Sequence, residues 1–296
     1  MPLLRLIRPL HLLLATLTYS LGASLADYLG TPFLANSFWL GLIVVLLAQA
    51  SMSLLPEVFR LDAEPLLENE TRIQRQTLRN NTLYVSVTFL TVIAVIAYLL
   101  FTNNQLPPSS LRQGSGQAFL FLLLSFLITL TYSIPPFRFV NRGLGEFLLA
   151  AHLAYVIPSI AYTLQTGDTH RFLSLTVPLT FLAFAYFIVM NFPTFATDRK
   201  LNRITFLTRL GWERVVPLHH IFVLSAYLLF LTSPAFGLSL SLLWPAFLTF
   251  PFAIFQIFQL RNISLGLPPN WTLLTATALA VFGLTTYFLT LTFWLR

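Results

Sequence analysis

Long runs of apolar residues, separated by short stretches that contain proline, glycine or arginine, dominate the chain. A helix needs about 20 residues to cross the apolar core of a bilayer, and each run is close to that length. The runs are continuous and lack the alternation that is typical of membrane β-barrels. We therefore predict nine transmembrane helices, at residues 9–29, 34–55, 81–102, 117–134, 144–165, 172–191, 215–233, 237–258 and 271–294.

The composition agrees with this fold class. Apolar residues make up 56% of the chain and charged residues only 9%, whereas about 25% of residues are charged in soluble globular domains. The chain has no cysteine, which excludes disulfides, zinc-thiolate sites and iron-sulfur clusters. We predict a single all-α membrane domain over residues 1–296, with two four-helix halves and a last helix around a central cavity.

The basic residues fall almost entirely on one side of the predicted spans. With nine spans, 14 of the 17 lysines and arginines lie on the side of the N-terminus, and the exceptions are Arg112, Arg171 and Arg296. The positive-inside rule then places the N-terminus in the cytoplasm and the C-terminus outside. We expect a multi-pass protein of a bacterial-type inner membrane. The net charge of +7 lies beside the spans, so we expect membrane lipids rather than nucleic acid as neighbours.

Two polar connections, at about residues 56–80 and 191–214, hold seven of the ten acidic residues. Acidic residues contribute little to topology, so their position beside the arginines needs another cause. Each connection follows an even-numbered span, and four spans lie between them, which is typical of a parallel tandem duplication. We therefore expect the two connections to converge over one functional site on the cytoplasmic side.

Three stretches carry motifs that occur together in a known family. They are Arg8 to His11 (RPLH), Tyr132 to Glu146 (YSIPPFRFVNRGLGE) and Asp198 to Gly211 (DRKLNRITFLTRLG). In order, spacing and placement among the spans, they resemble the UbiA superfamily of intramembrane prenyltransferases, especially its menaquinone- and chlorophyll-pathway branches. The resemblance implies transfer of a polyprenyl group from a prenyl diphosphate to a lipophilic acceptor, such as an aromatic compound or a quinone precursor.

The aspartate-rich motifs of that family are incomplete here. In the family, a pattern close to NxxxDxxxD in each polar connection holds magnesium on the substrate diphosphate. In the second connection Asp198 is the last acid, Thr194 stands in the place of the middle aspartate, and Asn191 lies beside the position of the leading asparagine. In the first connection the best remnant is Ser53, Glu57 and Asp62, and the two acids are five residues apart. The resemblance implies Mg²⁺ held by Asp198, Glu57, Asp62 and Asn191, either as a single ion or in a site dominated by arginines.

The chemistry of prenyl transfer suggests roles for the cations. As diphosphate leaves an allylic carbon, negative charge accumulates on its oxygens, and fixed cations stabilise it. Arginine side chains suit phosphate because their donors form a planar fork. The family motifs and this chemistry together predict the catalytic residues Asp198, Arg203, Arg138 and Tyr132. They also predict diphosphate binding by Arg8, Arg72, Lys200, Arg203 and Arg209.

Two alternative functions are compatible with the same residues. A homologue that has lost catalysis and binds a prenyl lipid or quinone, as a carrier or partner subunit, would account for the incomplete motifs. A small-molecule transporter would share the parallel repeat. Among single residues, Arg138 and Arg203 could contact lipid head groups, and Tyr132 could belong to an interfacial aromatic belt. His152 lies about two turns inside the fifth span, where a hydrogen bond between helices is a simpler role than catalysis.

Overall fold

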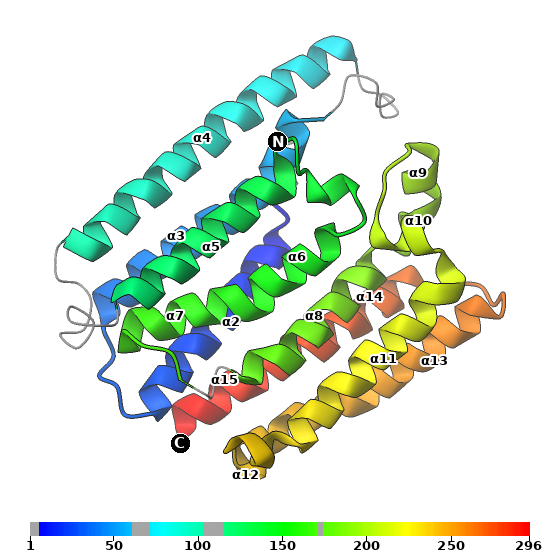
Figure 1. Cartoon of the computed structure of the whole chain (residues 1–296). Helices are drawn as coiled ribbons and strands as arrows, with labels where there is room; N and C mark the ends of the chain where they lie inside the picture. The colour runs from blue at the N-terminus through cyan, green and yellow to red at the C-terminus, as the bar shows by residue number, and fades with distance from the viewer. Residues whose placement is uncertain (1–5, 61–70, 103–114, 171–173) are drawn as a thin grey trace.

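The computed structural model describes residues 6–60, 71–102, 115–170 and 174–296, and all regular elements in these ranges are helical (Figure 1). The first part contains α2 (Pro9–Tyr28), α3 (Ala35–Val58), α4 (Arg72–Thr102), α5 (Ser115–Ser133), η2 (Phe139–Asn141), α6 (Gly145–Ala151), η3 (His152–Val156) and α7 (Ile157–Thr166). The second part contains α8 (Thr176–Met190), α9 (Phe195–Lys200), α10 (Phe206–Leu210), α11 (Trp212–Leu231), η5 (Ser233–Phe236), α12 (Leu240–Leu243), η6 (Trp244–Thr249), α13 (Phe250–Ser264), α14 (Trp271–Leu279), η7 (Ala280–Leu284) and α15 (Thr285–Leu295).

Eight helical stretches in the described ranges are long and apolar enough to cross a membrane. The segment predicted at 172–191 forms α8, whose 15 residues extend about 22 Å at a rise of 1.5 Å per residue. The apolar core of a bilayer is about 30 Å thick, so α8 is shorter than that core. The all-α, multi-pass membrane architecture is therefore confirmed, whereas the count of nine spans stays a prediction.

The polar connections contain more helix than the hydrophobic pattern indicates. Helix α4 begins at Arg72 rather than at residue 81 because a capping box precedes it: the Thr71 hydroxyl accepts from Gln74 N at 3.2 Å, and the Gln74 side chain accepts from Thr71 N at 3.0 Å. The second connection holds the short helices α9 and α10. The same kind of reciprocal cap, between Thr205 and Thr208, starts α10.

Helix α2 packs against α3, α7 and α15, inside the bundle. Gly22 permits its close approach to α7, because a Cβ atom at this position would overlap the Pro158 carbonyl oxygen. Small residues at such crossings are typical of helices packed within membranes. The Tyr19 hydroxyl also donates to the Phe38 carbonyl oxygen at 2.9 Å, which ties α2 to α3. These contacts fix α2 against α3 and α7.

His152 joins three helical segments inside the bundle. Its Nε2 lies 2.8 Å from the Ser125 hydroxyl on α5, and its Nδ1 lies 3.3 Å from Gln49 Oε1 on α3. All three side chains are buried. Hydrogen bonds of this kind hold helices together where no water is available. The expectation of a hydrogen bond between helices at His152 is confirmed.

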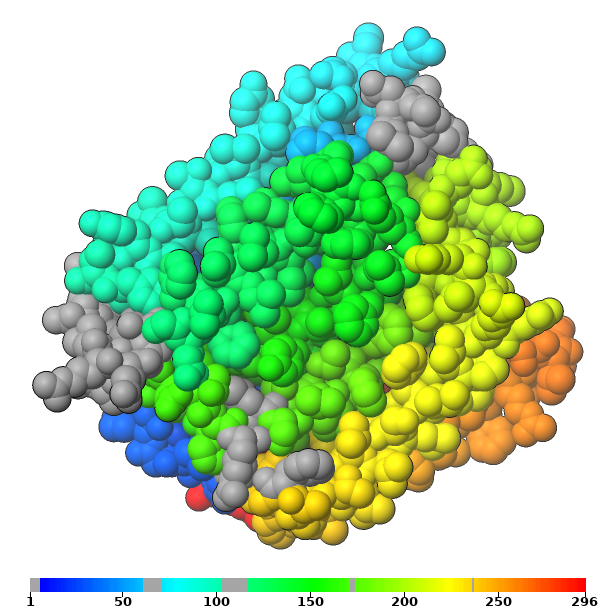
Figure 2. All heavy atoms as spheres, in the orientation of Figure 1, coloured from blue at the N-terminus to red at the C-terminus, as the bar shows by residue number. Residues whose placement is uncertain are grey.

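The described parts of the two polar connections lie at the same end of the bundle. The start of α4 and the pair α9 and α10 lie near the N-terminus, whereas the C-terminus and α12 lie at the opposite end (Figure 1). On the face drawn in Figure 2, side chains fill the spaces between neighbouring ribbons, and α4 lies along one edge. Helix α4 is also the least buried of the long apolar helices. The fold therefore gathers the polar segments over one end of a helical bundle.

Single cysteines will test which end of the bundle faces the cytoplasm. The parent chain has no cysteine, and Thr71 and Thr169 are exposed at opposite ends of the spans. From the distribution of basic residues, we expect a membrane-impermeant maleimide to label Thr169→Cys on intact cells and Thr71→Cys only after permeabilisation. Equal labelling of both variants on intact cells would contradict this topology.

Candidate functional site

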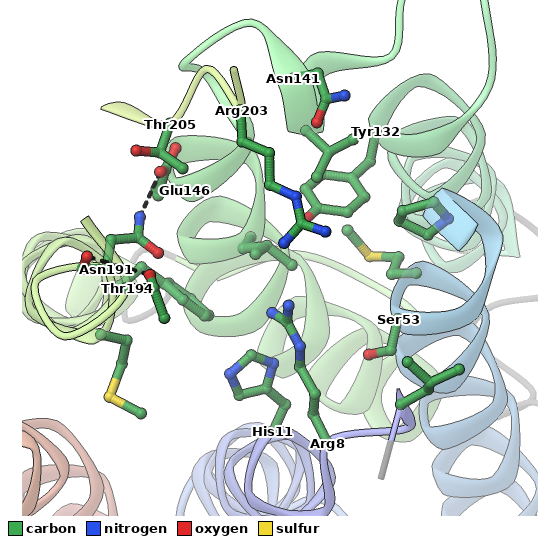
Figure 3. Close-up of a pocket in the computed structure, with 18 of the residues that line it drawn as sticks. Arg8, His11, Ser53, Tyr132, Asn141, Glu146, Asn191, Thr194, Arg203 and Thr205 are labelled. Atoms are coloured by element: carbon green, nitrogen blue, oxygen red, sulfur yellow. Dashed lines mark hydrogen bonds between the residues drawn. The ribbon is translucent and has the colours of Figure 1, made fainter. Parts of the chain in front are cut away.

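A cavity of about 500 Å³ opens at the end of the bundle where the polar connections meet (Figure 3). Its wall is built from the starts of α2 and α6, the ends of α3, α5 and α8, and the segments around α9 and η2. Most of these are helix termini, so polar side chains there reach a space between apolar helices. Lining residues from position 6 to position 205 show that the cavity depends on distant parts of the chain.

Seven of the predicted site residues line this cavity: Arg8, Glu57, Tyr132, Arg138, Asn191, Asp198 and Arg203. Glu57 and Asp198 come from the two different polar connections, so the structure brings both connections to one space. Tyr132 is buried against this cavity rather than exposed in an interfacial belt. Gly145 helps to place it, because a Cβ atom there would lie 3.2 Å from the Tyr132 ring.

Three predicted diphosphate ligands do not line the cavity. Arg72 and Lys200 are exposed, at the start of α4 and the end of α9. Arg209 Nη1 instead donates to the Arg142 carbonyl oxygen at 2.9 Å, so its side chain fastens α10 to the segment before α6. The remaining predicted metal ligand, Asp62, lies outside the described residues.

Three further ionisable residues of the cavity were not assigned a site role from the sequence: His11, Arg60 and Glu146. Two signals could have found them. His11 and Glu146 belong to the family-like motifs, and Arg60 follows Glu57 by one helical turn, with an Nη1 to Oε2 distance of 3.9 Å. Arg60, Arg138 and Glu146 are buried, although such residues are seldom buried in proteins without a specific interaction.

Asp198 organises the segment that carries Arg203. Its Oδ2 accepts a hydrogen bond from the Thr194 hydroxyl at 2.7 Å, and its Oδ1 lies 3.9 Å from Arg203 Nη1. The backbone is held as well, because Arg203 N donates to the Asp198 carbonyl oxygen at 2.8 Å and the Thr208 hydroxyl donates to the Arg203 carbonyl oxygen at 2.9 Å. These contacts fix the direction of the Arg203 side chain.

Glu146 forms a second polar centre on the same wall. Its Oε1 accepts from Asn191 Nδ2 at 2.5 Å and from Phe206 N at 2.9 Å. A single carboxylate oxygen therefore joins the start of α6, the end of α8 and the start of α10. Because these elements come from distant parts of the chain, Glu146 holds the wall of the cavity together.

The cations of the cavity converge on a common space. Figure 3 shows the guanidinium groups of Arg8 and Arg203 pointing toward one another from opposite walls. Like charges repel in this arrangement, and an anion placed between them would remove the repulsion. Both Arg8 and Arg138 have left-handed backbone conformations, with φ of 54° and 39°. Such outliers in non-glycine residues are strained, and they gather at ligand-binding sites.

Four arginines thus line one space with three carboxylates: Arg8, Arg60, Arg138 and Arg203 with Glu57, Glu146 and Asp198. Apolar side chains, including Met52, Leu149 and Phe187, complete the lining. The cavity therefore suits a molecule with a highly charged anionic end and an apolar body.

The side-chain oxygens that could bind a metal in this cavity suit at most a hydrated metal ion. Within the described ranges, no group of three or more histidine or acidic side chains is placed to hold a metal. Asp198 and Asn191 nevertheless line the same cavity, and Mg²⁺ often takes only one or two protein ligands while it keeps several waters and phosphate oxygens. Asp198 and Asn191 would be the residues to hold a single hydrated Mg²⁺ ion.

Neither a known family model nor a curated protein sequence matches the chain. Solved structures, however, share its fold. The apo structure of a UbiA homologue from Aeropyrum pernix K1 superposes with a TM-score of 0.63 at 15% identity, over 93% of this chain and 96% of that one. A UbiA homologue from Archaeoglobus fulgidus, bound to DMAPP and Mg²⁺, superposes with a TM-score of 0.61 at 14% identity, over 99% of both chains. The chain therefore has the fold of UbiA homologues along nearly its whole length.

Proposed function

We propose that the chain is a UbiA-type intramembrane prenyltransferase, which moves a polyprenyl group from its diphosphate to a lipophilic, aromatic or quinone-precursor acceptor. The observation that carries the proposal is the convergence of four arginines and Asp198 on one partly apolar cavity at the end of the bundle. The fold is the same as that of a homologue bound to DMAPP and Mg²⁺, and this supports a prenyl diphosphate as the substrate. Because one fold can host many chemistries, the residues of the cavity must account for the reaction.

The proposed reaction breaks the bond between the allylic carbon and the diphosphate oxygen. The electron pair leaves with the diphosphate, and the acceptor supplies the electrons for the new bond to carbon and then releases a proton. Arg8 and Arg203 point into the same space and would stabilise the charge that develops on the leaving oxygens. Arg138, from the first half of the chain, would add a third guanidinium group.

Asp198 would serve two purposes in this site. It holds the Arg203 guanidinium group by an ion pair and the Arg203 backbone by a hydrogen bond. With Asn191 and Glu57 it would also hold Mg²⁺ on the substrate diphosphate. The bound ion would neutralise part of the leaving-group charge. Because few carboxylates are available, arginines would carry a larger share of that charge than in homologues with complete aspartate motifs.

The apolar part of the lining would receive the allylic end of the prenyl chain and the acceptor. Leu149, Phe187 and Met52 line the same cavity as Tyr132. An aromatic wall suits a carbocation-like carbon, because the faces of aromatic rings attract positive charge. A site of this kind also excludes water, which would otherwise compete with the acceptor for the prenyl group.

The non-catalytic alternative has one observation in its favour, which is the small number of carboxylates at the positions of the aspartate-rich motifs. Thr194 occupies the position where an additional carboxylate is expected, and it donates a hydrogen bond to Asp198 instead. A carrier of prenyl lipids would need the apolar cavity and no transition-state stabilisation. Product formation distinguishes the two functions: purified protein should prenylate at least one member of a panel of aromatic and quinone-precursor acceptors, measured by mass spectrometry with prenyl diphosphates of several lengths.

Replacement of Arg203 by alanine should lower turnover by roughly a hundredfold or more, the effect of removing one preorganised charge partner from a transition state. The matched control is Arg214→Ala, which removes an exposed arginine that does not line the cavity. Steady-state rates of the two variants provide the test. Equal rates for both would show that Arg203 does not stabilise the leaving group.

Replacement of Thr194 by aspartate should strengthen the binding of magnesium. The new carboxylate would lie beside Asp198, and two neighbouring carboxylates repel unless a cation lies between them. We expect the Mg²⁺ concentration for half-maximal turnover to fall by about tenfold. Thr197→Asp, on the exposed side of α9, is the control and should leave this concentration at the parent value. An identical Mg²⁺ titration for Thr194→Asp and the parent would refute the proposed position of the ion.

A further inference from the structure

The side-chain amide of Asn191 lies between Glu146 and the open part of the cavity. Its Nδ2 donates to Glu146 Oε1, and the rest of the amide faces the space that Arg8 and Arg203 also enter (Figure 3). Among the described residues, no protein donor makes a hydrogen bond to Asn191 Oδ1. The amide thus has a fixed nitrogen end and an oxygen end that remains available to a ligand.

The carboxylate of Glu146 determines which end of this amide faces the ligand. Glu146 Oε1 accepts from Phe206 N and is therefore an acceptor toward Asn191 as well, whereas an asparagine amide both donates and accepts. The nitrogen must therefore face Glu146, and the oxygen must face the cavity. Without an acceptor at position 146, the amide could rotate and present its NH₂ group, which repels cations instead of binding them.

Glu146 is itself held firmly. It lies in the first turn of α6, is buried, and accepts a second hydrogen bond from Phe206 N at 2.9 Å. Its Oε2 has no hydrogen-bond partner in the described part of the chain. A buried carboxylate with one unsatisfied oxygen costs folding free energy, so packing alone does not explain its presence.

We infer that Glu146 is a positioning residue that presents Asn191 Oδ1, beside Asp198, as a neutral oxygen ligand for the Mg²⁺ ion on the substrate diphosphate. The inference rests on the proposed function and names a residue that works through another. It also accounts for the position of Asn191, which is one residue beyond the expected leading asparagine. A fixed hydrogen bond aims the amide oxygen from this neighbouring position.

The test is a titration of Mg²⁺ against binding of geranyl S-thiolodiphosphate, a prenyl diphosphate analogue that reacts only slowly, by isothermal calorimetry on the detergent-solubilised full chain. Glu146→Leu and Asn191→Ala should each raise the Mg²⁺ concentration for half-maximal binding about tenfold, the lower range for loss of a partner that orients a metal ligand. The double variant should show no further increase, because the first change already removes the effect of the second.

The Glu146→Gln variant distinguishes positioning of the Asn191 amide by a hydrogen bond from an effect of the Glu146 charge. The amide oxygen of glutamine can accept from both Asn191 Nδ2 and Phe206 N, so this variant should bind the analogue with a Mg²⁺ requirement within about threefold of the parent. Glu213→Leu is the matched control, because Glu213 lies in the first turn of α11 but is exposed and outside the cavity. It should match the parent.

Several results would overturn the inference. One is a Mg²⁺ titration of Glu146→Leu or Asn191→Ala that matches the parent. Another is an increase of about a hundredfold in the Mg²⁺ concentration for half-maximal binding in the double variant. A third is a Mg²⁺ requirement in Glu146→Gln that rises as much as in Glu146→Leu. If Glu146→Leu fails to fold, Asn191→Ala and Glu146→Gln decide by the same criteria. A parent that binds no analogue refutes both this inference and the proposed function. A parent that shows the predicted binding but transfers no prenyl group refutes only the proposed function.

Discussion

A charged side chain placed among apolar helices loses its hydration, and it is stable there only if hydrogen bonds or opposite charge replace the water. Asp198 and Glu146 are both buried under this constraint. Asp198 accepts from Thr194 and faces Arg203, and Glu146 accepts from Asn191 and Phe206. The partners of Asp198 are local, so this carboxylate fixes the segment from Thr194 to Arg203. The partners of Glu146 lie on other segments, so the requirement to satisfy this carboxylate holds α6, α8 and α10 together. The geometry of the cavity follows from that requirement.

The same constraint explains why the cavity lies at an end of the bundle. Deep inside, His152 forms a closed set with Ser125 and Gln49, in which both ring nitrogens have partners. At the end of the bundle, helices stop and their connections supply additional polar groups. A ligand with a charged head and an apolar body would find polar and apolar partners together there.

The acidic and basic groups of the cavity also complement each other chemically. Aspartate-rich motifs neutralise a diphosphate through metal ions, and arginines do so directly. In this chain the acidic set is reduced, whereas four arginines line the cavity. Two of these arginines have strained backbones, at Arg8 and Arg138, and the surrounding packing must maintain them. A site with more arginine and less carboxylate would bind the same anion with a weaker requirement for metal.

Local sequence determined the elements of this protein, and tertiary contacts decided which side chains share a site. Apolar run length was sufficient to locate most of the helices because a membrane demands about 20 apolar residues whatever the neighbours are. The start of α4 was also readable, since the Thr71 and Gln74 capping box is a local signal. Asp198, Arg203 and Tyr132, which belong to the motifs, all line the cavity.

Side-chain direction was not readable in the same way. Arg209 and Arg203 are six residues apart in one motif, but Arg209 turns toward the Arg142 carbonyl oxygen, 67 residues away in sequence. The orientation of the Asn191 amide likewise depends on Glu146, 45 residues away. A motif records which residue types are close along the chain. The hydrogen-bond partners that aim them come from other helices, and only the folded structure brings these helices together.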